Sequence, residues 1–573
     1  MLLLNPHKLD RFYPDEISKQ IMEKTVQWFE NKGKINLLND DFERVWYQDF
    51  LDFLKENKIF YKLLTPAKYG DGSTRWDTWR NCEFNEILAF YGLHYWYTWQ
   101  VTILGLGPIF LSKNEKVKKE TVSLLKEGGI FAFGLSEKEH GADIYSSDMI
   151  LTKHGENTYT AKGSKYYIGN GNKASFVSVF GKSKPPFYPE DKKYGSYTFF
   201  VVKTDHEKYE LVRNLVAVSS YVAEYRLNDY PITEDEILAK GREAWDMALN
   251  TVNIGKFNLG FASIGIATHA FYEAIIHASH RILYGKAVTE FPHIQSFFVE
   301  AYCRLVSMKL FALRAADYFR VATPEDRRYL LYNPMVKMWV TLQGEEVIDL
   351  LWDIIAAKGF EKTTYFSLAT RDIRALPKLE GTVHVNMALV LKFMKNYFFN
   401  HAVFEEVPQV SEPKNDDFLF EQPPAKNLGK IRFHDYRKVY NMFNLPNVNR
   451  FKRNIKWLKL LLIVAPPTKA QSRDFDFLLN LGKLFTLVIY GQLILENTKY
   501  YKISDDLLEE IFDVLIRDFA KYALVLKSKP QCSWKQRWFC SRMLCRPKAN
   551  RERFKRVWEK EVFTLKDLYE MNP

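Results

Sequence analysis

Residues 371–386 read Arg-Asp-Ile-Arg-Ala-Leu-Pro-Lys-Leu-Glu-Gly-Thr-Val-His-Val-Asn and place the carboxylate of Glu380 between two local structure signals. Pro377 disfavours the continuation of a helix from upstream, and Gly381 gives the backbone freedom to turn. Thr382 is a residue type that caps helices, and helix-forming residues follow it. We therefore predict that Glu380 lies in a short connection that enters a helix.

This stretch alone leaves two interpretations of Glu380 open. The first is a structural acid near a helix N-terminus, where the helix dipole favours a carboxylate by about 0.3–1 kcal/mol. The second is a general base that accepts a proton from a substrate, in a setting of apolar neighbours. The rest of the chain has to distinguish them.

Composition limits the class of protein. At 573 residues, the chain is long enough for three to five domains by the usual prior of roughly 100–200 residues each. Its five cysteines show no CxxC spacing, so we predict no zinc or disulfide-redox motif, no metal site and a reducing compartment. The N-terminus lacks the apolar core of a secretory signal, and no uncharged apolar run reaches about 18 residues. We expect a cytoplasmic protein.

The net charge of +12 is concentrated at one end of the chain. Residues 401–573 carry 31 Lys and Arg against 21 Asp and Glu, which leaves only +2 for residues 1–400. The body of the protein is therefore nearly neutral, and whatever the basic charge does depends on the C-terminal part.

Hydrophobic periodicity predicts an α+β protein of four parts. Residues 1–128 form a helical N-terminal domain, with helices at 16–31 and 41–57 and an aromatic stretch at 84–110 that we interpret as core. Residues 129–240 form a β-rich middle domain, with strands at 149–152, 158–161, 176–180, 198–202 and 222–227. Residues 241–400 form a helical bundle that contains Glu380, and 401–573 form a basic helical extension.

Four ordered segments resemble one enzyme family. They are Phe-Ala-Phe-Gly-Leu-Ser-Glu-Lys-Glu-His-Gly-Ala-Asp at 131–143, Gly-Ser-Lys-Tyr-Tyr-Ile-Gly-Asn-Gly at 163–171, Arg-Ile-Leu-Tyr-Gly-Lys at 281–286, and Lys-Gly-Phe at 358–360 followed by Arg-Asp and Glu-Gly-Thr. In this order and spacing they resemble the flavin-binding segments and the catalytic approach of the acyl-CoA dehydrogenase family, over roughly residues 10–400. The resemblance implies the α+β fold of that family, bound FAD and oxidation of an acyl thioester.

The resemblance also implies roles for individual residues. Glu380 matches the base that removes the α-proton while hydride leaves the β-carbon for the flavin. Cofactor-binding positions are Leu135, Ser136, Tyr167, Gly169, Arg281, Tyr284, Asp353, Ala357 and Thr382. Substrate-binding positions are Ala142, Asn253, Lys256 and Gly381.

Several of these positions differ from the family pattern. Gly169 stands where the family has a flavin-contacting Thr, and Ala142 stands where it has Ser. Lys256 with Asn253 replaces an Arg and Asp pair beside the acyl-CoA channel, and Leu379 replaces a Tyr. Asp353, Ala356 and Ala357 replace a Gln-x-x-Gly-Gly segment. Since the loss of one hydroxyl contact costs on the order of 1 kcal/mol, these changes affect substrate choice and flavin contact more than the fold.

The extension is similar in plan to the very-long-chain branch of the family, in which an added helical domain assists dimer formation and membrane contact. We predict helices at about 447–464, 474–498 and 504–527, after a linker or surface strap at 404–424. Residues 521–560 contain 13 Lys and Arg against 2 Asp and Glu, interleaved with Trp534, Trp538, Phe539 and Trp558. This pattern suits an anionic membrane surface, but a solvated basic face or a dock for an acidic protein fits it as well. No nucleic-acid-binding module accompanies the charge.

The sequence leaves three hypotheses for function. The first is FAD-dependent α,β-dehydrogenation of an acyl-CoA, of medium to long chain, by a homo-oligomer that passes electrons to an electron-transfer flavoprotein. The second is a divergent, non-catalytic family member that acts as a binding or assembly subunit. The third keeps the chemistry but uses an acyl carrier protein in place of CoA, or oxygen as the electron acceptor. The peripheral membrane contact would place the protein at the inner membrane surface.

Overall fold

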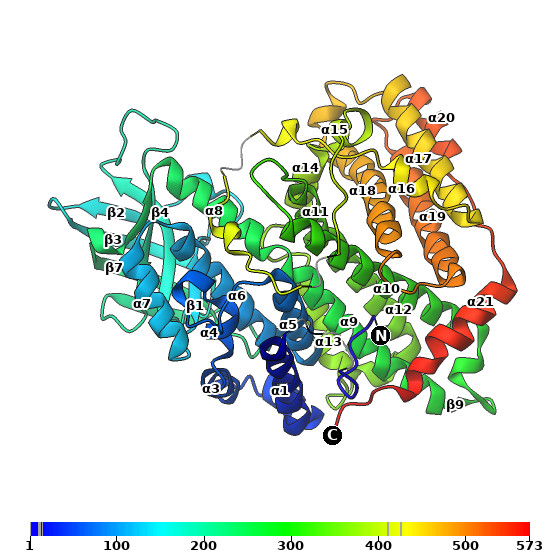
Figure 1. Cartoon of the computed structure of the whole chain (residues 1–573), viewed down its shortest axis with the longest axis horizontal. Coiled ribbons are helices and arrows are strands. Elements are labelled where there is room, and N and C mark those ends of the chain that lie inside the picture. Colours follow the sequence, from blue (N-terminus) through cyan, green and yellow to red (C-terminus); the bar gives the residue numbers. More distant parts are fainter. Residues whose placement is uncertain (1, 10–12, 14, 410–411, 424–426) are drawn as a thin grey trace. The chain divides into compact units, whose positions relative to one another are not determined.

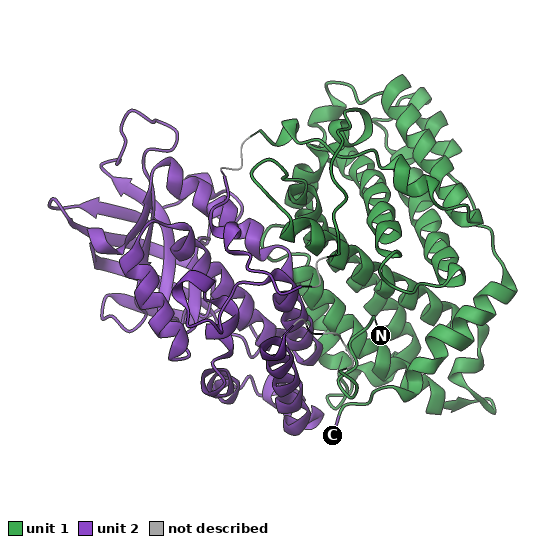
Figure 2. Ribbon diagram, viewed as in Figure 1, with its two compact units in different colours: residues 1–11, 259–410, 427–571 green, residues 12–258, 411–426, 572–573 purple. Residues whose placement is uncertain are grey.

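The structure, a computed structural model, describes residues 2–9, 13, 15–409, 412–423 and 427–573. The chain forms two compact units, which Figure 2 shows in two colours. The sheet unit contains residues 12–258, 411–426 and 572–573, and the helical unit contains residues 1–11, 259–410 and 427–571. Each unit therefore combines segments from distant parts of the sequence.

The sheet unit begins with helices that local signals delimit. Asp15 caps the first helix by accepting a hydrogen bond from Ser18 N at 2.8 Å, and Gly33 ends it with φ of +77°. The elements are α1 (Glu16–Lys32), α2 (Lys34–Phe42), α3 (Gln48–Glu56), α4 (Ile59–Leu64), η1 (Ala67–Tyr69), α5 (Thr78–Tyr91), α6 (Leu93–Leu111) and α7 (Glu115–Lys126). Trp96 and Trp99 on α6 are fully buried, which confirms that the aromatic stretch is core.

The single helix predicted at 41–57 is wrong. The structure has α2 ending at Phe42 and α3 beginning at Gln48, with Arg44 in the left-handed region at φ of +57°. Apolar residues on both sides of this break keep helical spacing, so periodicity alone does not reveal it.

A mixed sheet forms the middle of the same unit (Figure 1). Its strands are β1 (Phe131–Gly134), β2 (Ile150–Lys153), β3 (Thr158–Gly169), β4 (Phe176–Lys184), β5 (Tyr197–Val202), β6 (Tyr209–Asn214), β7 (Val222–Thr233) and β8 (Ile237–Lys240), with the short turns η2 (Ile144–Ser146) and η3 (Glu234–Glu236) between them. The order is β6-β7-β3-β2-β4-β5-β8, and β1 pairs in parallel with β4. The five predicted strands are confirmed; β1, β6 and β8 were not predicted.

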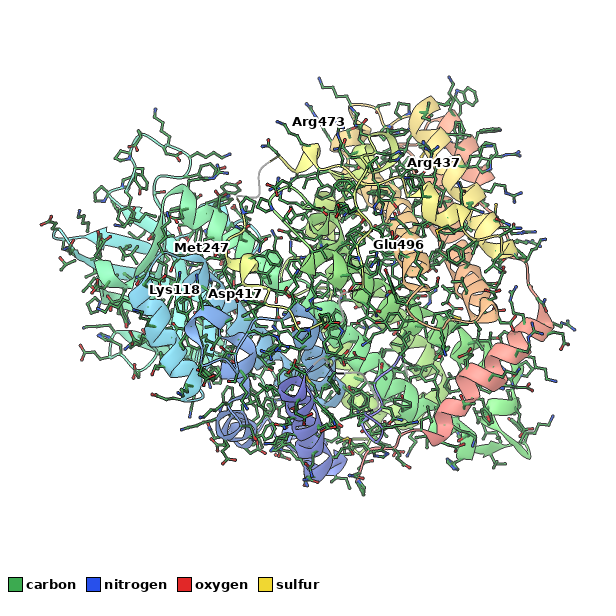
Figure 3. All side chains as sticks on the ribbon, viewed as in Figure 1. Lys118, Met247, Asp417, Arg437, Arg473 and Glu496 are labelled. Carbon is green, nitrogen blue, oxygen red and sulfur yellow. The ribbon has the colours of Figure 1, made fainter. Side chains whose placement is uncertain are left out.

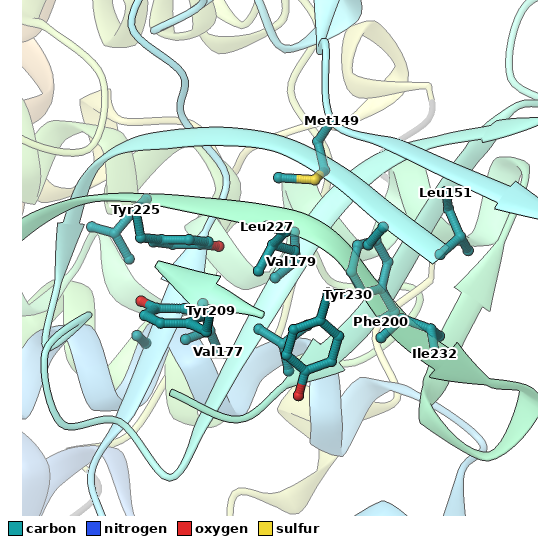
Figure 4. Packing of buried hydrophobic residues seen from close by; sticks show 14 of the residues in the cluster. Met149, Leu151, Val177, Val179, Phe200, Tyr209, Tyr225, Leu227, Tyr230 and Ile232 are labelled. Carbon is teal, nitrogen blue, oxygen red and sulfur yellow. The ribbon is translucent and has the colours of Figure 1, made fainter. Parts of the chain in front are cut away.

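The sheet has a core of aliphatic and tyrosine side chains, including Met149, Val179 and Phe200 (Figure 4). Tyr209 and Tyr225 stack in this core with ring centroids 4.6 Å apart. On the other side of β1 and β4 lies α6. The loop after β1, which carries the first resemblance segment, is therefore anchored in a packed scaffold.

Two further segments complete the sheet unit. α8 (Arg242–Gly255) follows β8, and residues 412–423 return from far downstream with a short helix, η7 (Asp417–Phe420). In this strap Asp416 N donates to Trp76 O at 2.7 Å, and Asp416 Oδ2 accepts from Thr78 N at 2.8 Å. The predicted segment 404–424 is thus a packed strap over its described residues; 410, 411 and 424 lie outside them.

The helical unit contains the bundle that carries Glu380. Its elements up to residue 400 are α9 (Asn258–His280), β9 (Ile282–Leu283), β10 (Lys286–Ala287), η4 (Val288–Glu290), α10 (Pro292–Arg320), α11 (Tyr329–Met335), the π-helical turn η5 (Val336–Val340), α12 (Thr341–Ile355), η6 (Ala356–Phe360), α13 (Phe366–Ala375), α14 (Val383–Leu391) and α15 (Met394–Phe399). The helix predicted from the 294–312 face is confirmed as α10.

The extension belongs to the same helical unit. Its elements are η8 (Leu428–Lys430), α16 (Arg437–Asn441), α17 (Pro446–Val464), η9 (Gln471–Arg473), α18 (Phe475–Asn497), α19 (Asp505–Ser528), α20 (Trp534–Arg542), α21 (Arg551–Val557), the π-helical turn η10 (Trp558–Val562) and η11 (Phe563–Asp567). The three predicted helices are confirmed as α17, α18 and α19, and α18 and α19 pack on α10.

Buried ion pairs tie the extension to the bundle. Arg304 on α10 donates to both carboxylate oxygens of Asp518 on α19, at 2.8 and 3.0 Å. Arg314, about three helical turns further along α10, donates to Glu496 on α18 at 2.9 Å (Figure 3 labels Glu496). These charged residues are at most 5% exposed, so the extension is part of one core with the bundle.

Among the described residues, two helical stretches are long and apolar enough to cross a membrane, 242–280 and 475–497. In their most apolar windows, 89% and 83% of the residues are buried inside the protein. Core helices show the same combination of length and hydropathy, so this observation is weak evidence for a membrane span.

Candidate functional site

Glu380 lies on a tight turn between α13 and α14. Glu380 and Gly381 are both in the left-handed region, with φ of +51° and +85°. Before them, Lys378 N and Leu379 N both donate to Ala375 O, at 2.9 and 3.1 Å. A non-glycine residue in this region costs free energy and is enriched at functional sites. The turn directs a half-buried carboxylate away from the regular helices, and the predicted connection is confirmed.

The predicted capping by Thr382 is only partly correct. Thr382 occupies the N-cap position of α14, but its side chain makes no capping hydrogen bond and is exposed. Instead, the buried amide of Asn386 donates to Gly381 O and to Thr382 O, both at 3.0 Å. The hydroxyl of Thr382 is therefore not used by the helix.

The loop after β1 is tied to β3 in the sheet unit. Ser136 Oγ donates to Tyr166 O at 2.7 Å, and Tyr166 N donates back to Ser136 O at 3.0 Å. Lys165 Nζ donates to Leu135 O at 3.0 Å. Leu135 and Ser136, both half-buried, are thus held by the strand that carries Tyr167.

A buried ion pair lies under this loop. Lys165 Nζ donates to Glu137 Oε1 at 2.7 Å, and Ser147 Oγ and Asp148 N also donate to the Glu137 carboxylate. Burial lowers the pKa of Lys165 to about 8. Burial alone raises the pKa of Glu137, but Lys165 outweighs it and the net direction is down. Neither residue was predicted. Lys165 and Glu137 lie 28 positions apart in the sequence, and only the folded sheet unit brings their side chains together.

Glu137, His140 and Asp148 also form a group whose spacing could hold a metal ion. The Glu137 carboxylate is already bound by Lys165, Ser147 and Asp148 N, so its arrangement is explained without one.

Tyr167 and Gly169 lie at the end of β3, where Tyr167 is exposed and Gly169 is buried. Tyr167 has φ of +64° where the β3–β7 register shifts, and its ring is 62% exposed. Gly169 is buried: a Cβ there would lie 2.7 Å from both Tyr97 Cε1 and Val101 Cγ1 of α6. Tyr97 and Val101 leave no room for the threonine side chain of the family at position 169. Gly169 offers only its backbone.

The remaining predicted positions of the sheet unit differ in exposure. Ala142 is exposed in the loop after β1. Asn253 lies in the last turn of α8, and Lys256 is its C-cap; both are buried.

A second group of predicted positions gathers around His277 in the helical unit. Burial lowers the pKa of His277, and the nearby charges of Arg281 and Lys358 lower it further. Arg281 is half-buried at the start of the β9–β10 hairpin, and Lys358 lies in η6. Glu361 acts on His277 in the opposite direction and pairs with Lys358 at 3.0 Å, so Arg281 is the cation of this group that can face an anionic ligand.

The tips of these segments are exposed. Tyr284 and Gly285 form the hairpin turn, with φ of +51° and +75°, and the Tyr284 side chain is 96% exposed. Asp353 on α12 and Ala357 in η6 are also exposed. The structure thus brings Glu380, Gly381 and Thr382 onto one turn, Leu135, Ser136 and Tyr167 onto one loop and strand, and Arg281 beside η6.

Each group, taken within its own unit, offers chemistry that suits one part of a flavin dinucleotide. In the sheet unit, the exposed ring of Tyr167 beside the half-buried loop at Leu135 and Ser136 suits a planar ring system. In the helical unit, the guanidinium of Arg281 suits a pyrophosphate. The hydroxyl of Thr382 at the start of α14 adds a hydrogen-bonding group near a helix N-terminus.

Comparison with known proteins finds a family model that matches most of the bundle. Residues 243–395 match the family model described as acyl-CoA dehydrogenase, C-terminal domain. The chain is 24% identical over 393 residues to the short-chain-specific acyl-CoA dehydrogenase of Megasphaera elsdenii, which covers 65% of this chain and 96% of that protein. It is 23% identical over 300 residues to an acyl-CoA dehydrogenase of Bacillus subtilis, with coverage of 51% and 76%.

Solved structures share the fold. The FAD-complexed acyl-CoA dehydrogenase of Bacillus anthracis superposes with a TM-score of 0.72 at 18% identity and covers 98% of both chains, so its likeness includes the extension. A prolyl acyl carrier protein oxidase superposes with a TM-score of 0.56 at 21% identity, covering 66% of this chain and 99% of that one.

Proposed function

We propose, from these similarities, that the chain is a member of the acyl-CoA dehydrogenase family and an FAD-dependent oxidoreductase that introduces a double bond between the α and β carbons of an acyl thioester. We propose an acyl-CoA of medium to long chain as the substrate, a homo-oligomer as the working form, and an electron-transfer flavoprotein as the acceptor.

The observation that carries this proposal is the backbone at Glu380. Two consecutive left-handed residues put a half-buried carboxylate at the end of a turn that buried residues fix on both sides. Such a carboxylate can remove the weakly acidic α-proton of a thioester when the substrate lies against it. FAD, when bound, supplies the acceptor for the β-hydride.

The chain's own residues would hold the ligands. In the proposal, Ser136, Leu135 and the backbone of Gly169 bind the edge of the ring system, and Tyr167 packs beside it. Arg281, Tyr284, Asp353, Ala357 and Thr382 complete the flavin contacts, and Arg281 balances the pyrophosphate charge. Asn253, Lys256, Ala142 and Gly381 contact the acyl thioester.

Replacing Glu380 with Gln tests the reaction. The variant keeps the size and polarity of the side chain but cannot accept the proton, so anaerobic bleaching of bound flavin by acyl-CoA should slow about 10²–10⁴-fold. Glu325→Gln, on an exposed loop, is the matched control and should bleach like the wild type. A Glu380→Gln protein that bleaches at the wild-type rate would show that Glu380 is not the base.

The same assay separates the alternatives. A panel of acyl-CoAs of increasing length, with acyl carrier protein thioesters beside it, assigns the substrate. Peroxide release during turnover in air would assign the oxidase variant. Purified protein without flavin that takes up no added FAD would assign the assembly-subunit hypothesis.

We further propose a peripheral, anionic membrane contact through residues 521–573, with the outer side of α20 facing the membrane from the cytoplasmic side. Trp534 and Trp538 on α20 are 74% and 49% exposed, and the Arg542 guanidinium lies over the Trp538 ring at 5.6 Å. Exposed tryptophan beside basic residues suits the headgroup region of an anionic bilayer. Phe539 and Trp558 were predicted to share this face but are buried, so they do not contribute to it.

A further inference from the structure

Lys337 is a buried lysine that no sequence motif marks. It lies in the π-helical turn η5 and has no exposed surface. Its Nζ donates to Pro377 O at 2.7 Å and also to Gly381 O. These two carbonyls bracket Glu380, one three residues before it and one directly after it.

The two hydrogen bonds from Lys337 replace backbone hydrogen bonds that the turn cannot form. In a continuing helix, Pro377 O would accept from the amide of Gly381, but Glu380 and Gly381 are both left-handed. One ammonium group satisfies both carbonyls, and Asn386 Nδ2 adds a second hydrogen bond to Gly381 O at 3.0 Å. The peptide groups on either side of the Lys378–Glu380 segment therefore have fixed orientations.

The position of Lys337 is itself built into the fold. Thr341 Oγ1 donates to Lys337 O at 2.5 Å, which satisfies a carbonyl in the π-helical turn. On the neighbouring helix α9, a Cβ at Gly260 would lie 2.9 Å from Val336 O, so glycine is needed for α9 to approach η5 this closely. Single π-helical turns within α-helices are frequent at functional sites.

We infer that Lys337 is the positioning residue of the Glu380 turn: its ammonium holds the carbonyls of Pro377 and Gly381 so that the Glu380 carboxylate keeps the orientation needed for proton removal. The inference rests on the proposed function for its catalytic consequence. Its structural part stands on the two hydrogen bonds alone.

Lys337→Met tests both parts, because it keeps the length and apolar stem of the side chain and removes the donor. Hydrogen exchange of peptides covering 376–382, measured without substrate, should become at least about tenfold faster, while peptides of α12 keep wild-type exchange. Since a misplacement of about 1 Å can cost about 10²-fold in rate, flavin bleaching at saturating acyl-CoA should slow about 10–100-fold. The half-saturating acyl-CoA concentration and the flavin content should stay within about threefold of the wild type.

Lys483→Met is the matched control, since Lys483 is half-buried on α18 with its ammonium over the Tyr522 ring at 5.0 Å. It should leave exchange at 376–382 and the bleaching rate within about twofold of the wild type. If Lys337→Met gives no folded protein, Asn386→Ala removes the other donor to Gly381 O, and exchange at 376–382 and bleaching should change in the same directions.

Wild-type exchange and bleaching in Lys337→Met would overturn the inference, as would unchanged values in Asn386→Ala if that variant has to be used. A bleaching loss that follows loss of flavin, with unchanged exchange at 376–382, would also overturn it. The proposed function is tested by a different outcome. If no acyl thioester bleaches the flavin of the wild-type protein, the proposed function is wrong. The exchange measurement would still decide whether Lys337 holds the turn.

Discussion

Replacing Glu496 with Gln should destabilise the helical unit by about 3 kcal/mol at neutral pH. Glu496 Oε2 accepts from Arg314 Nε at 2.9 Å and from Tyr318 Oη at 3.0 Å, and Oε1 accepts from Gln492 at 2.7 Å. Burial by itself raises the pKa of Glu496, but His434, Arg314 and Gln492 lower it from the usual 4.5 to about 2. A pKa lowered by this amount contributes on the order of 3 kcal/mol to the free energy of unfolding at neutral pH.

The general cost of breaking a buried ion pair gives a similar loss of unfolding free energy. Removing one partner of a buried ion pair costs about 3–5 kcal/mol, because the remaining charge stays buried. Arg314 retains Asp317 at 3.1 Å and Val407 O at 2.7 Å, which favours the lower end of that range.

The pH dependence follows from the sign of the shift. The pKa of Glu496 is lower in the folded state than in the unfolded chain, so its stabilisation is complete above about pH 4.5 and disappears as the pH falls toward 2. The difference in unfolding free energy between wild type and Glu496→Gln should therefore be constant from pH 7 to pH 5 and shrink below it. Urea unfolding followed by hydrogen exchange of α10 and α18 peptides measures this difference in the helical unit.

Glu406→Gln is the matched control, since Glu406 is an exposed acid paired with Lys499. Exposed pairs contribute about 0–1 kcal/mol, so this variant should stay close to the wild type. A loss below 1 kcal/mol in Glu496→Gln at pH 7, or a difference that does not shrink below pH 4.5, would refute the assignment of the Arg314–Glu496 pair as a main tie between extension and bundle.

Two further predictions concern Gly169 and the tryptophans of α20. Gly169→Ala should lower the unfolding free energy of the sheet unit by about 1–3 kcal/mol, because its Cβ would contact Tyr97 and Val101; adding Val101→Ala should recover part of the loss, and no recovery would argue against this packing. Trp534→Ala with Trp538→Ala should weaken binding to anionic vesicles about tenfold and leave flavin bleaching unchanged, as measured by co-sedimentation. Tyr188→Ala, an exposed aromatic on the sheet unit, is the control, and equal binding by all three proteins would reject the membrane contact.

Local sequence patterns predicted many of the helices, because apolar spacing within one segment is enough to indicate a helix. Helices α17, α18 and α19 were placed to within two residues from apolar spacing alone. Strands β6 and β8 were not predicted, because β6 is largely exposed and β8 places only three buried residues between Glu236 and Lys240. β1 was read as part of a motif, and its pairing with β4 depends on residues 45 positions away.

The candidate site also contains residues that local sequence reveals and residues that only the structure reveals. Glu380 was found because Pro377, Gly381 and the flanking motif are contiguous in sequence. Lys337 was not, since its partners lie about 40 positions downstream and a lysine in an apolar helix has no local sign of being buried. The reason for glycine at 169 also required the structure, because Tyr97 and Val101 come from a helix about 70 residues earlier.

The path of the chain between its two units has a consequence for synthesis. The sheet unit takes most of its residues from 12–258, yet the strap at 412–423 and the last two residues also belong to it, and Lys34 N donates to Asn572 O at 2.8 Å. During translation, residues 12–258 therefore emerge before the strap and residues 572–573 that complete their unit. A fragment that ends at residue 400 would lack the Asp416 bonds to Trp76 and Thr78, so the sheet unit is complete only with residues from beyond that point.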